Sequence, residues 1–359
     1  MTAQKQGMKK KILFIIPKGL GGAQKMTIVI SQLLPKDNYD ICYLFVGRKH
    51  EKDLRGLLDG KQTISEINIR NAWDFLTIRL IKEMKRQKPD IVFSSLMYIN
   101  IRAILAAKAI GGIKIVVRND NMLKIQRWDS ILLLRLTYKM ADTIIAQQEE
   151  MKADIITTLS LNPAKVVVRH NPVDTKYISE KANAPSPYKD SQSTKFIWTG
   201  NFSYTGSKGQ DILVKAFKIV KERIANAELY LLGSFNESDK FYKDIVSYIS
   251  NNKLTGSIHI IGFQDNPYPW VKWADCFVLP SRIEGLPNAL VDAMVLGKPV
   301  VATTCIPMIG RMVRNGYNGF LVVSEDYNAM ADAMIKALSL HDFKMTYKPS
   351  SAHDFIELF

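Results

Sequence analysis

The sequence predicts an α/β protein with two doubly wound, parallel-sheet domains, and three observations support this. Short β-branched runs alternate with helix-length segments over most of the chain. The alternation stops once, in a stretch rich in proline and serine, and then resumes. A glycine-containing turn follows the first strand of each half. Alternating strands and helices give parallel strands joined by helical crossovers, so each half should form an open sheet covered on both faces.

The expected strands are short runs of apolar and β-branched residues. Those of the first half are residues 12–16, 41–46, 91–93, 113–117, 143–146 and 166–168. Those of the second half are residues 195–199, 229–232, 258–261, 276–279, 300–302 and 320–322. Helices are expected between them, for example over residues 211–224 and 288–296.

The interruption divides the chain into domains. Residues 1–172 are expected to form the N-terminal α/β domain and residues 195–340 the C-terminal one. Between them, residues 173–194 include Pro185, Ser186 and Pro187, a composition typical of a linker. Residues 341–359 are expected to be a short tail. Open α/β sheets bind ligands at the carboxyl ends of their strands, so two facing domains predict a cleft between them.

Composition excludes several classes of protein. At 359 residues, with 47% hydrophobic and 23% charged residues, the chain has enough material for two globular domains. No apolar run approaches the roughly 18 residues of a membrane span, and the run 12–16 ends at Pro17, like a strand rather than a signal peptide. The three cysteines lie far apart, without CxxC spacing, which favours a reducing compartment and argues against disulfides or zinc. We therefore expect a cytoplasmic protein.

The formal net charge of +15 indicates an anionic partner. Nucleic acid is disfavoured because the chain lacks zinc-finger spacing and any run of five basic residues. A membrane surface is favoured by residues 122–140, where apolar and basic residues alternate around Trp128. These are Ile131, Leu132, Leu133, Leu134, Leu136 and Met140 with Lys124, Arg127, Arg135 and Lys139. Such a helix can lie in the headgroup region of a bilayer, or it can be a buried helix with a solvated basic edge.

The first chemical motif is the turn at residues 17–24, directly after the first strand. Its Gly21 and Gly22 allow a ligand close to the backbone, and the helix that follows begins with amides that favour an anion. A purely structural turn explains the same glycines. The spacing is not GxGxxG, so a nicotinamide enzyme is not indicated.

The second motif, residues 199–209, occupies the matching position in the second domain. It contains Asn201 and the triplet Ser207, Lys208 and Gly209. An ammonium at this turn can neutralise a diphosphate leaving group. The alternative is a surface lysine beside a turn glycine.

The third motif, residues 279–288, ends a strand and starts a helix. Pro287 suits a first helical turn, and the amides of Gly285, Leu286 and Asn288 can form a nest for phosphate.

Two carboxylates accompany this nest, Glu284 before the turn and Asp292 on the helix. Carboxylates beside a phosphate site need hydroxyl donors, and sugar or ribose hydroxyls are suitable partners. A capping glutamate and a solvated aspartate are the alternative.

Together these motifs resemble the family 4 retaining glycosyltransferases of the GT-B fold, including bacterial enzymes of surface-polysaccharide synthesis, from Ile12 to about Met334. The matching segments are residues 21–24, 141–145, 170–174, 200–209, 261–263, 274–281, 284–288 and 297–303.

The resemblance implies roles for five positions. Glu284 would contact the donor sugar, Asp292 the ribose and Lys208 the diphosphate, while Gly21 and Gly22 would close over the phosphates. Residues 1–172 would form the acceptor side, and residues 195–340 would bind a nucleoside-diphosphate sugar. That sugar nucleotide is a co-substrate, and no metal or other cofactor is implied. The chain also lacks an Asp-x-Asp pair.

The sequence departs from the family pattern in several places. Asp292 is one methylene shorter than the usual glutamate, and Asn201 replaces an arginine, which removes a positive charge. A histidine usual near Val117 is absent, and Arg118 and Asp120 stand nearby as acceptor-side candidates. Asp120 could accept a proton or cap a helix. The tail beyond Leu340 is shorter than is usual in the family.

The resemblance implies that a sugar is transferred with retention of anomeric configuration to a saccharide or lipid-linked saccharide. The charge of the chain favours peripheral contact with the inner face of the plasma membrane. A GT-B sugar-nucleotide epimerase and a non-catalytic, donor-binding partner subunit are the alternatives.

Overall fold

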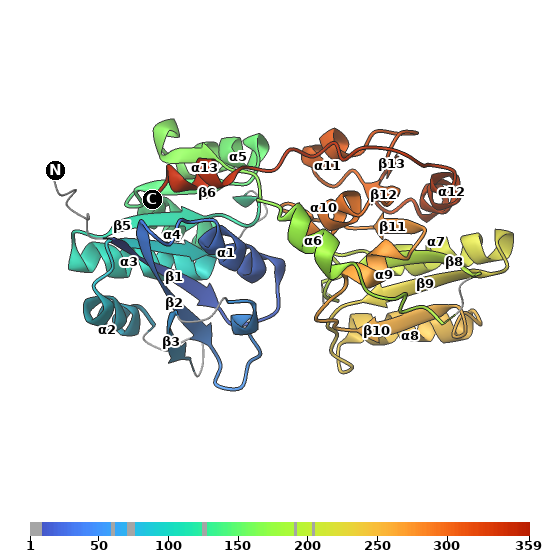
Figure 1. Ribbon diagram of the computed structural model, residues 1–359, viewed down its shortest axis with the longest axis horizontal. Coiled ribbons are helices and arrows are strands. Elements are labelled where there is room, and N and C mark those ends of the chain that lie inside the picture. The colour runs from blue at the N-terminus through green and yellow to red at the C-terminus, as the bar shows by residue number, and fades with distance from the viewer. Residues whose placement is uncertain (1–8, 59–61, 70–75, 124–127, 190–191, 203–204) are drawn as a thin grey trace, which may run out of the picture. The chain divides into compact units, whose positions relative to one another are not determined.

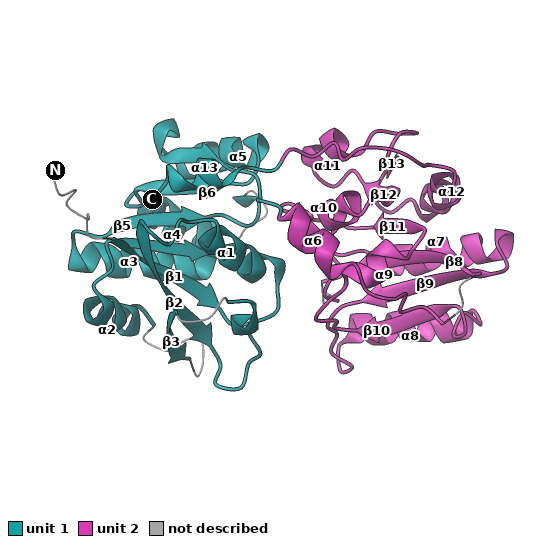
Figure 2. Ribbon diagram, viewed as in Figure 1, with its two compact units in different colours: residues 1–173, 349–359 teal, residues 174–348 magenta. Residues whose placement is uncertain are grey.

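The computed structural model describes residues 9–58, 62–69, 76–123, 128–189, 192–202 and 205–359. The chain divides into two compact units, one of Met1–Val173 with Pro349–Phe359 and one of Asp174–Lys348 (Figure 2). Each unit holds a parallel sheet with its helices (Figure 1), which confirms the predicted fold class.

The first unit has a seven-stranded sheet in the order β3-β2-β1-β4-β5-β6-β7. Its strands are β1 (Lys10–Pro17), β2 (Tyr39–Gly47), β3 (Thr63–Asn68), β4 (Ile91–Ser95), β5 (Lys114–Arg118), β6 (Thr143–Ala146) and β7 (Val166–Val168). Its α-helices are α1 (Gly22–Gln32), α2 (Leu76–Gln87), α3 (Met97–Ile110), α4 (Trp128–Tyr138), α5 (Glu149–Leu159) and α13 (Ala352–Ile356). Short 3-10 helices cover Arg55–Leu57 and Pro163–Lys165.

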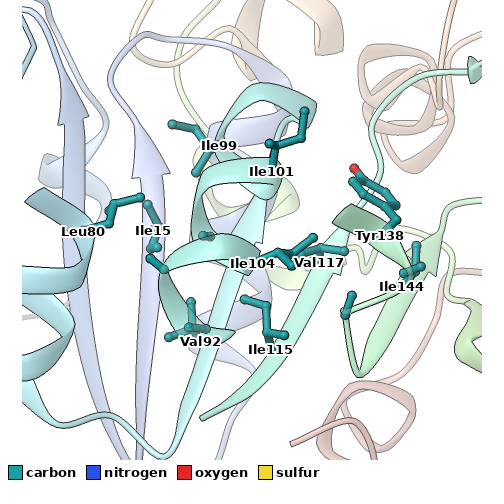
Figure 3. Packing of buried hydrophobic residues seen from close by; sticks show 14 of the residues in the cluster. Ile15, Leu80, Val92, Ile99, Ile101, Ile104, Ile115, Val117, Tyr138 and Ile144 are labelled. Carbon is teal, nitrogen blue, oxygen red and sulfur yellow. The ribbon is translucent and has the colours of Figure 1, made fainter. Parts of the chain in front are cut away.

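Strand β1 is apolar throughout its centre because both of its faces are buried. Leu13 and Ile15 face a core completed by α2, α3, α4 and α5, part of which Figure 3 shows. Ile12, Phe14 and Ile16 face a second core, completed by α1 and α13. Successive residues of a strand point to opposite faces, so one strand contributes to both cores.

The second unit has a six-stranded sheet in the order β10-β9-β8-β11-β12-β13. Its strands are β8 (Thr194–Thr199), β9 (Ala227–Leu232), β10 (Ile258–Gly262), β11 (Cys276–Leu279), β12 (Val300–Thr303) and β13 (Gly319–Val322). Its helices are α6 (Thr175–Lys181), α7 (Gln210–Arg223), α8 (Lys240–Asn251), α9 (Tyr268–Lys272), α10 (Asn288–Val295), α11 (Pro307–Met312) and α12 (Tyr327–Ala337). Phe196 and Trp198 of β8 pack with α7, α8 and α12 in its core.

Every expected strand is present, but β3 was not predicted. It is an edge strand that pairs with β2 alone among the strands described. Thr63 and Ile64 are exposed, while Ile67 is buried. Because this strand is largely open to solvent, it lacks the continuous apolar run of the central strands.

The predicted linker, residues 173–194, differs in the structure because most of it belongs to the second unit. Helix α6 begins where the Asp174 carboxylate accepts a hydrogen bond of 2.8 Å from the Tyr177 amide. Tyr188 is buried, and its hydroxyl donates to the Trp270 carbonyl oxygen at 2.5 Å. Composition indicated irregular backbone but did not reveal this anchor.

The predicted tail, residues 341–359, is divided between the units. Residues 349–359 pack with the first unit, where the Phe359 ring lies 5.9 Å from the rings of Phe14 and Phe93, measured between centroids. Lys10 Nζ donates to the Phe359 carbonyl oxygen at 3.2 Å. The segment is therefore part of the first unit's core.

Candidate functional site

The candidate site lies where the winding of the second sheet reverses, between β8 and β11. Open α/β sheets bind ligands at such a switch point, beyond the carboxyl ends of the strands. The second predicted motif directly follows β8, and the third directly follows β11. Residues 203 and 204 of the second motif lie outside the described residues.

The structure brings together Lys208 and Glu284, the two predicted charged groups. Lys208 Nζ lies 2.8 Å from Glu284 Oε1 and 2.9 Å from Oε2. The Ser281 hydroxyl donates to Glu284 Oε1 at 2.7 Å. The Glu284 side chain is only 8% exposed, and these partners satisfy a buried carboxylate. The Lys208 side chain is 33% exposed, so it is partly open to solvent.

Two glycines shape the turn that carries Lys208. Gly206 and Gly209 have φ values of +68° and +70°, which glycine adopts readily. A Cβ at Gly209 would lie 1.9 Å from the carbonyl oxygen of Pro280. The Arg282 amide donates to the Ser207 carbonyl oxygen at 2.8 Å. The lysine turn therefore lies directly against the segment that leads to Glu284.

Arg282 fastens this turn with its side chain. Its guanidinium donates to both carboxylate oxygens of Asp211, each at 2.8 Å. It also donates to the Gly206 carbonyl oxygen at 2.7 Å and to Glu325 Oε2 at 2.8 Å. Such forked, charge-assisted bonds fix geometry as well as adding stability. We refer to Arg282, Asp211, Glu325 and the Gly206 carbonyl as the arginine clamp.

The arginine clamp shifts the acidity of its carboxyl groups. Burial raises the pKa of Asp211, but the hydrogen bonds and charge of Arg282 outweigh burial, and the net pKa is lowered. The hydrogen bonds of Arg282 also lower the pKa of Glu325. The sequence does not predict the arginine clamp, because the spacing of Asp211, Arg282 and Glu325 along the chain gives no sign that they meet.

The third motif starts helix α10 as predicted. Gly285 and Leu286 precede Pro287, which is the N-cap residue, and Asn288 is the first helical residue. Asp292 lies about one turn into the helix and is partly buried. The first amides of a helix carry partial positive charge, so this end of α10 can attract phosphate.

The side chain of Asn201 connects two loops. Its Oδ1 accepts a hydrogen bond from the Ser234 amide at 3.2 Å. Nearby, Gly233 has a φ of +146°, and a Cβ there would lie 1.6 Å from the Gly200 carbonyl oxygen. Where the family pattern has an arginine, the asparagine thus joins the loops after β8 and β9.

Cys305, which sequence reasoning did not select, lies within electrostatic reach of the charged pair. Burial raises the pKa of its thiol, and the negative charge of Glu284 raises it further, to about 11. The thiol follows β12, the neighbour of β11 in the sheet. Only the three-dimensional order of the strands reveals this proximity.

In the first unit, the predicted glycine turn joins β1 to α1. Gly21 is the N-cap residue of α1, and Gly22 is its first residue. Gly19 has a φ of +122°, so it is the glycine that the backbone requires here. Lys18 is buried, and its ammonium donates to Glu66 Oε1 at 2.5 Å and to Asn68 Oδ1 at 3.0 Å. The positive charge of Lys18 is therefore compensated within the first unit by Glu66.

The two acceptor-side candidates have different environments. Arg118 is buried, with Nη2 donating to Asn171 Oδ1 at 2.6 Å. Asp120 is partly buried, which raises the pKa of its carboxyl although the charge of Arg118 opposes that shift. Asn121 and Met122, which directly follow Asp120, are not helical, so Asp120 is not a helix N-cap residue.

Neither a metal-binding cluster nor a membrane-spanning helix occurs among the residues that the structure describes. Within those ranges, no group of three His, Cys, Asp or Glu residues is arranged to hold a metal ion. In the same part of the chain, no helix has the length and hydrophobicity needed to cross a bilayer.

Comparison with family models gives two matches. Residues 20–177 match glycosyltransferase family 4, and residues 193–340 match the group 1 glycosyl transferases. The matches fall on the two structural units and confirm the resemblance predicted from the sequence.

Individual proteins are similar over much of the chain. An uncharacterized glycosyltransferase of Methanocaldococcus jannaschii is 28% identical over 278 residues, 71% of this chain and 67% of that protein. The N-acetylgalactosamine-N,N'-diacetylbacillosaminyl-diphospho-undecaprenol 4-alpha-N-acetylgalactosaminyltransferase of Campylobacter jejuni is 23% identical over 355 residues, 95% and 93% of the two chains. The structure of Anabaena HepE with UDP-glucose has a TM-score of 0.77 at 19% identity, covering 92% of this chain and 90% of that one. This structural likeness shows the GT-B fold.

Proposed function

We propose that this chain, whose two domains belong to glycosyltransferase family 4 and the group 1 glycosyl transferases, transfers a sugar from a nucleoside-diphosphate sugar with retention of anomeric configuration. The observation that carries the proposal is the contact of Lys208 with Glu284 at the switch point of the second sheet. It combines a cation for a diphosphate with a carboxylate for sugar hydroxyls.

The proposed roles follow from the chemistry of each group. Lys208 neutralises the diphosphate as it departs, together with the amides at the start of α10. As Lys208 turns toward the phosphate oxygens, Glu284 accepts hydrogen bonds from sugar hydroxyls. The amides of Gly285, Leu286 and Asn288 form the phosphate nest, and Pro287 is the N-cap residue of the helix that follows.

Four further residues are assigned to the donor site. Asp292 lies on α10 beyond the nest, and we assign it to the ribose hydroxyls, with a water compensating for its shorter side chain. Gly21 and Gly22 of the first unit are assigned to the donor phosphates. Asn201 is assigned to ordering the loop that leads to Lys208 through its bond to Ser234.

The transfer step needs no dedicated protein base. The acceptor oxygen bonds to the anomeric carbon while the bond from that carbon to the diphosphate oxygen breaks. The proton of the acceptor hydroxyl passes to the departing phosphate oxygen. We propose that no metal or further cofactor takes part, with Lys208 and the helix amides providing the positive charge.

We propose that the acceptor is a saccharide, in particular a lipid-linked one used in surface-polysaccharide synthesis. The name of the Campylobacter jejuni relative, which describes transfer to a diphospho-undecaprenol-linked sugar, supports this class of acceptor. We assign Asp120 to the acceptor side and place the protein in the cytoplasm, peripherally at the inner face of the plasma membrane.

The test compares transfer by Lys208→Met and Glu284→Gln with that by two control variants. Lys215→Met and Glu222→Gln make the same chemical changes at exposed positions of α7. We expect the site variants to lose about 100-fold or more in transfer, which is typical of removing one transition-state contact, while both controls stay active. A site variant with full activity would reject the assignment.

A second candidate function is a donor-binding partner subunit without turnover. It is favoured by Asn201, which places an amide bonded to Ser234 where the family has an arginine. Donor binding without transfer to any saccharide tested, restored by Asn201→Arg or by a second protein, would support that alternative. Conversion of the donor to an isomer without an acceptor would indicate an epimerase.

A further inference from the structure

The outward face of α4 consists of large apolar side chains. Trp128 is 77% exposed, Leu132 53% and Leu136 62%, and these residues are four positions apart, so they align along the helix. Leu133, which is 46% exposed, lies beside them. Exposed apolar groups gathered in this way are typical of an interaction surface.

The opposite face of α4 already makes the contacts that the fold requires. Leu134, Thr137 and Tyr138 are buried in the core of the first unit. The Tyr138 hydroxyl also bonds to the side chains of Asn100, at 3.0 Å, and Asn119, at 3.2 Å. These contacts fix the rotation of the helix, so its outer apolar face remains directed to solvent.

Basic groups border this face at its C-terminal end. Arg135 is held by a 2.8 Å bond from its guanidinium to the Thr158 carbonyl oxygen. Lys165 Nζ donates to the Lys139 carbonyl oxygen at 2.6 Å, which brings a second basic residue beside exposed Lys139. Asp129, in the first turn, is the one acidic residue of the helix. The charge of the face agrees in sign with the +15 of the whole chain.

We propose that this docking face, made of Trp128, Leu132, Leu133, Leu136, Arg135 and Lys139, binds the surface of an anionic lipid bilayer. An eleven-residue helix is too short to cross a bilayer but can lie flat in the headgroup region. The indole of Trp128 suits that region because one part of it is apolar and its N–H is polar. The basic residues favour anionic headgroups over neutral ones.

This membrane-binding face rests on the proposed location at the inner face of the plasma membrane. Vesicle binding tests it without any measurement of sugar transfer. The full chain is mixed with vesicles of phosphatidylcholine alone or with phosphatidylglycerol added, and bound protein is measured by flotation. We expect binding to the anionic vesicles that weakens as salt is raised. Leu132→Ser combined with Leu136→Ser should lower the partition coefficient by about tenfold or more. Replacing Arg135 and Lys139 by glutamine should lower it by about fivefold per charge.

Ile78→Ser is the matched control, because Ile78 is 51% exposed on α2 of the same unit. It should bind vesicles like the unaltered chain, and circular dichroism should show all variants folded. Equal binding to neutral and anionic vesicles, or unchanged binding by the double serine variant, would overturn the proposal. So would a lipid-free dimer that the serine changes dissociate, because the face would then bind a second copy.

Separate measurements test the membrane-binding face and the proposed donor site. Vesicle binding by Lys208→Met should be unchanged, whereas its affinity for nucleoside diphosphates should fall. The double serine variant should keep its affinity for nucleoside diphosphates in the absence of lipid.

Discussion

Gly209→Ala tests whether close contact between two loops positions Lys208. Gly209 has a φ of +70°, and the new Cβ would lie 1.9 Å from the Pro280 carbonyl oxygen, whereas real Cβ contacts essentially never fall below 3.0 Å. The lysine turn and the Pro280 segment must therefore separate by about 1 Å. Both segments lead directly to the charged pair, Lys208 and Glu284.

The expected size of the effect has two parts. A left-handed alanine costs about 1–2 kcal/mol, and forcing apart a packed contact costs about 1–3 kcal/mol, so the unfolding free energy should fall by about 2–5 kcal/mol. A displacement of about 1 Å among positioning groups can reduce the rate about 100-fold. Urea unfolding followed by tryptophan fluorescence gives the first quantity, and sugar transfer at a temperature where the variant is folded gives the second.

Alanine substitutions at two other glycines of the second unit distinguish the cost of backbone strain from the cost of the loop contact. Gly297 has a φ of +65° but no atom within 4 Å of its Cβ position, so Gly297→Ala should cost about 1–2 kcal/mol. Gly256 has open space and no positive φ, so Gly256→Ala should be neutral or slightly stabilising. Both should retain transfer. If Gly209→Ala were as stable as Gly297→Ala and fully active, the loop contact would not position the lysine.

Three further predictions concern ionisable side chains, two in the candidate site and one in the first unit. Arg282→Ala should lower the unfolding free energy by about 2–3 kcal/mol and reduce sugar transfer. Arg282→Lys should recover only part of the stability and part of the transfer, because lysine lacks the forked guanidinium. Urea unfolding measures the first quantity, and transfer rates measure the second. Hydrogen bonds from Lys18 and Arg55 lower the pKa of Glu66 to about 2 from 4.5, so its ionised form stabilises the fold above about pH 4.5 and this stability is lost as the pH falls toward 2. The melting temperature of Glu66→Gln should therefore depend less on pH in that range than that of the unaltered chain. Iodoacetamide should label Cys305 slowly at pH 8 and faster toward pH 11, and Glu284→Gln should lower the apparent pKa of this labelling, with Cys305→Ser as the control.

The fold could be predicted because buried parallel strands have a distinctive pattern. Central strands such as β1 are apolar on both faces, and of the strands described only β3, an edge strand partly open to water, escapes this pattern. Composition could not assign residues 173–194 to a unit. That assignment depends on single anchors such as buried Tyr188, which contacts Trp270 through its hydroxyl.

Part of the candidate site was predictable because its residues follow strands that the sequence predicts. Lys208 and Glu284 are 76 positions apart, but each follows a central strand, and parallel strands end at the same edge of the sheet. The arginine clamp was not predictable, because Asp211 and Glu325 reach Arg282 only after α7 and the segment before α12 have packed. The ion pair of buried Lys18 with Glu66 was not predicted either, since a lysine beside glycines gives no sign that it will be enclosed.

The most direct test of the central claim compares the affinity of a nucleoside diphosphate with that of its sugar conjugate by isothermal titration calorimetry. A thermal-shift panel of nucleoside diphosphates first identifies the preferred base. We expect Lys208→Met to weaken the binding of both ligands, whereas Glu284→Gln should weaken the binding of the sugar conjugate alone. If Glu284→Gln left both affinities unchanged, or if Lys208→Met bound the diphosphate normally, the charged pair would not be the donor site.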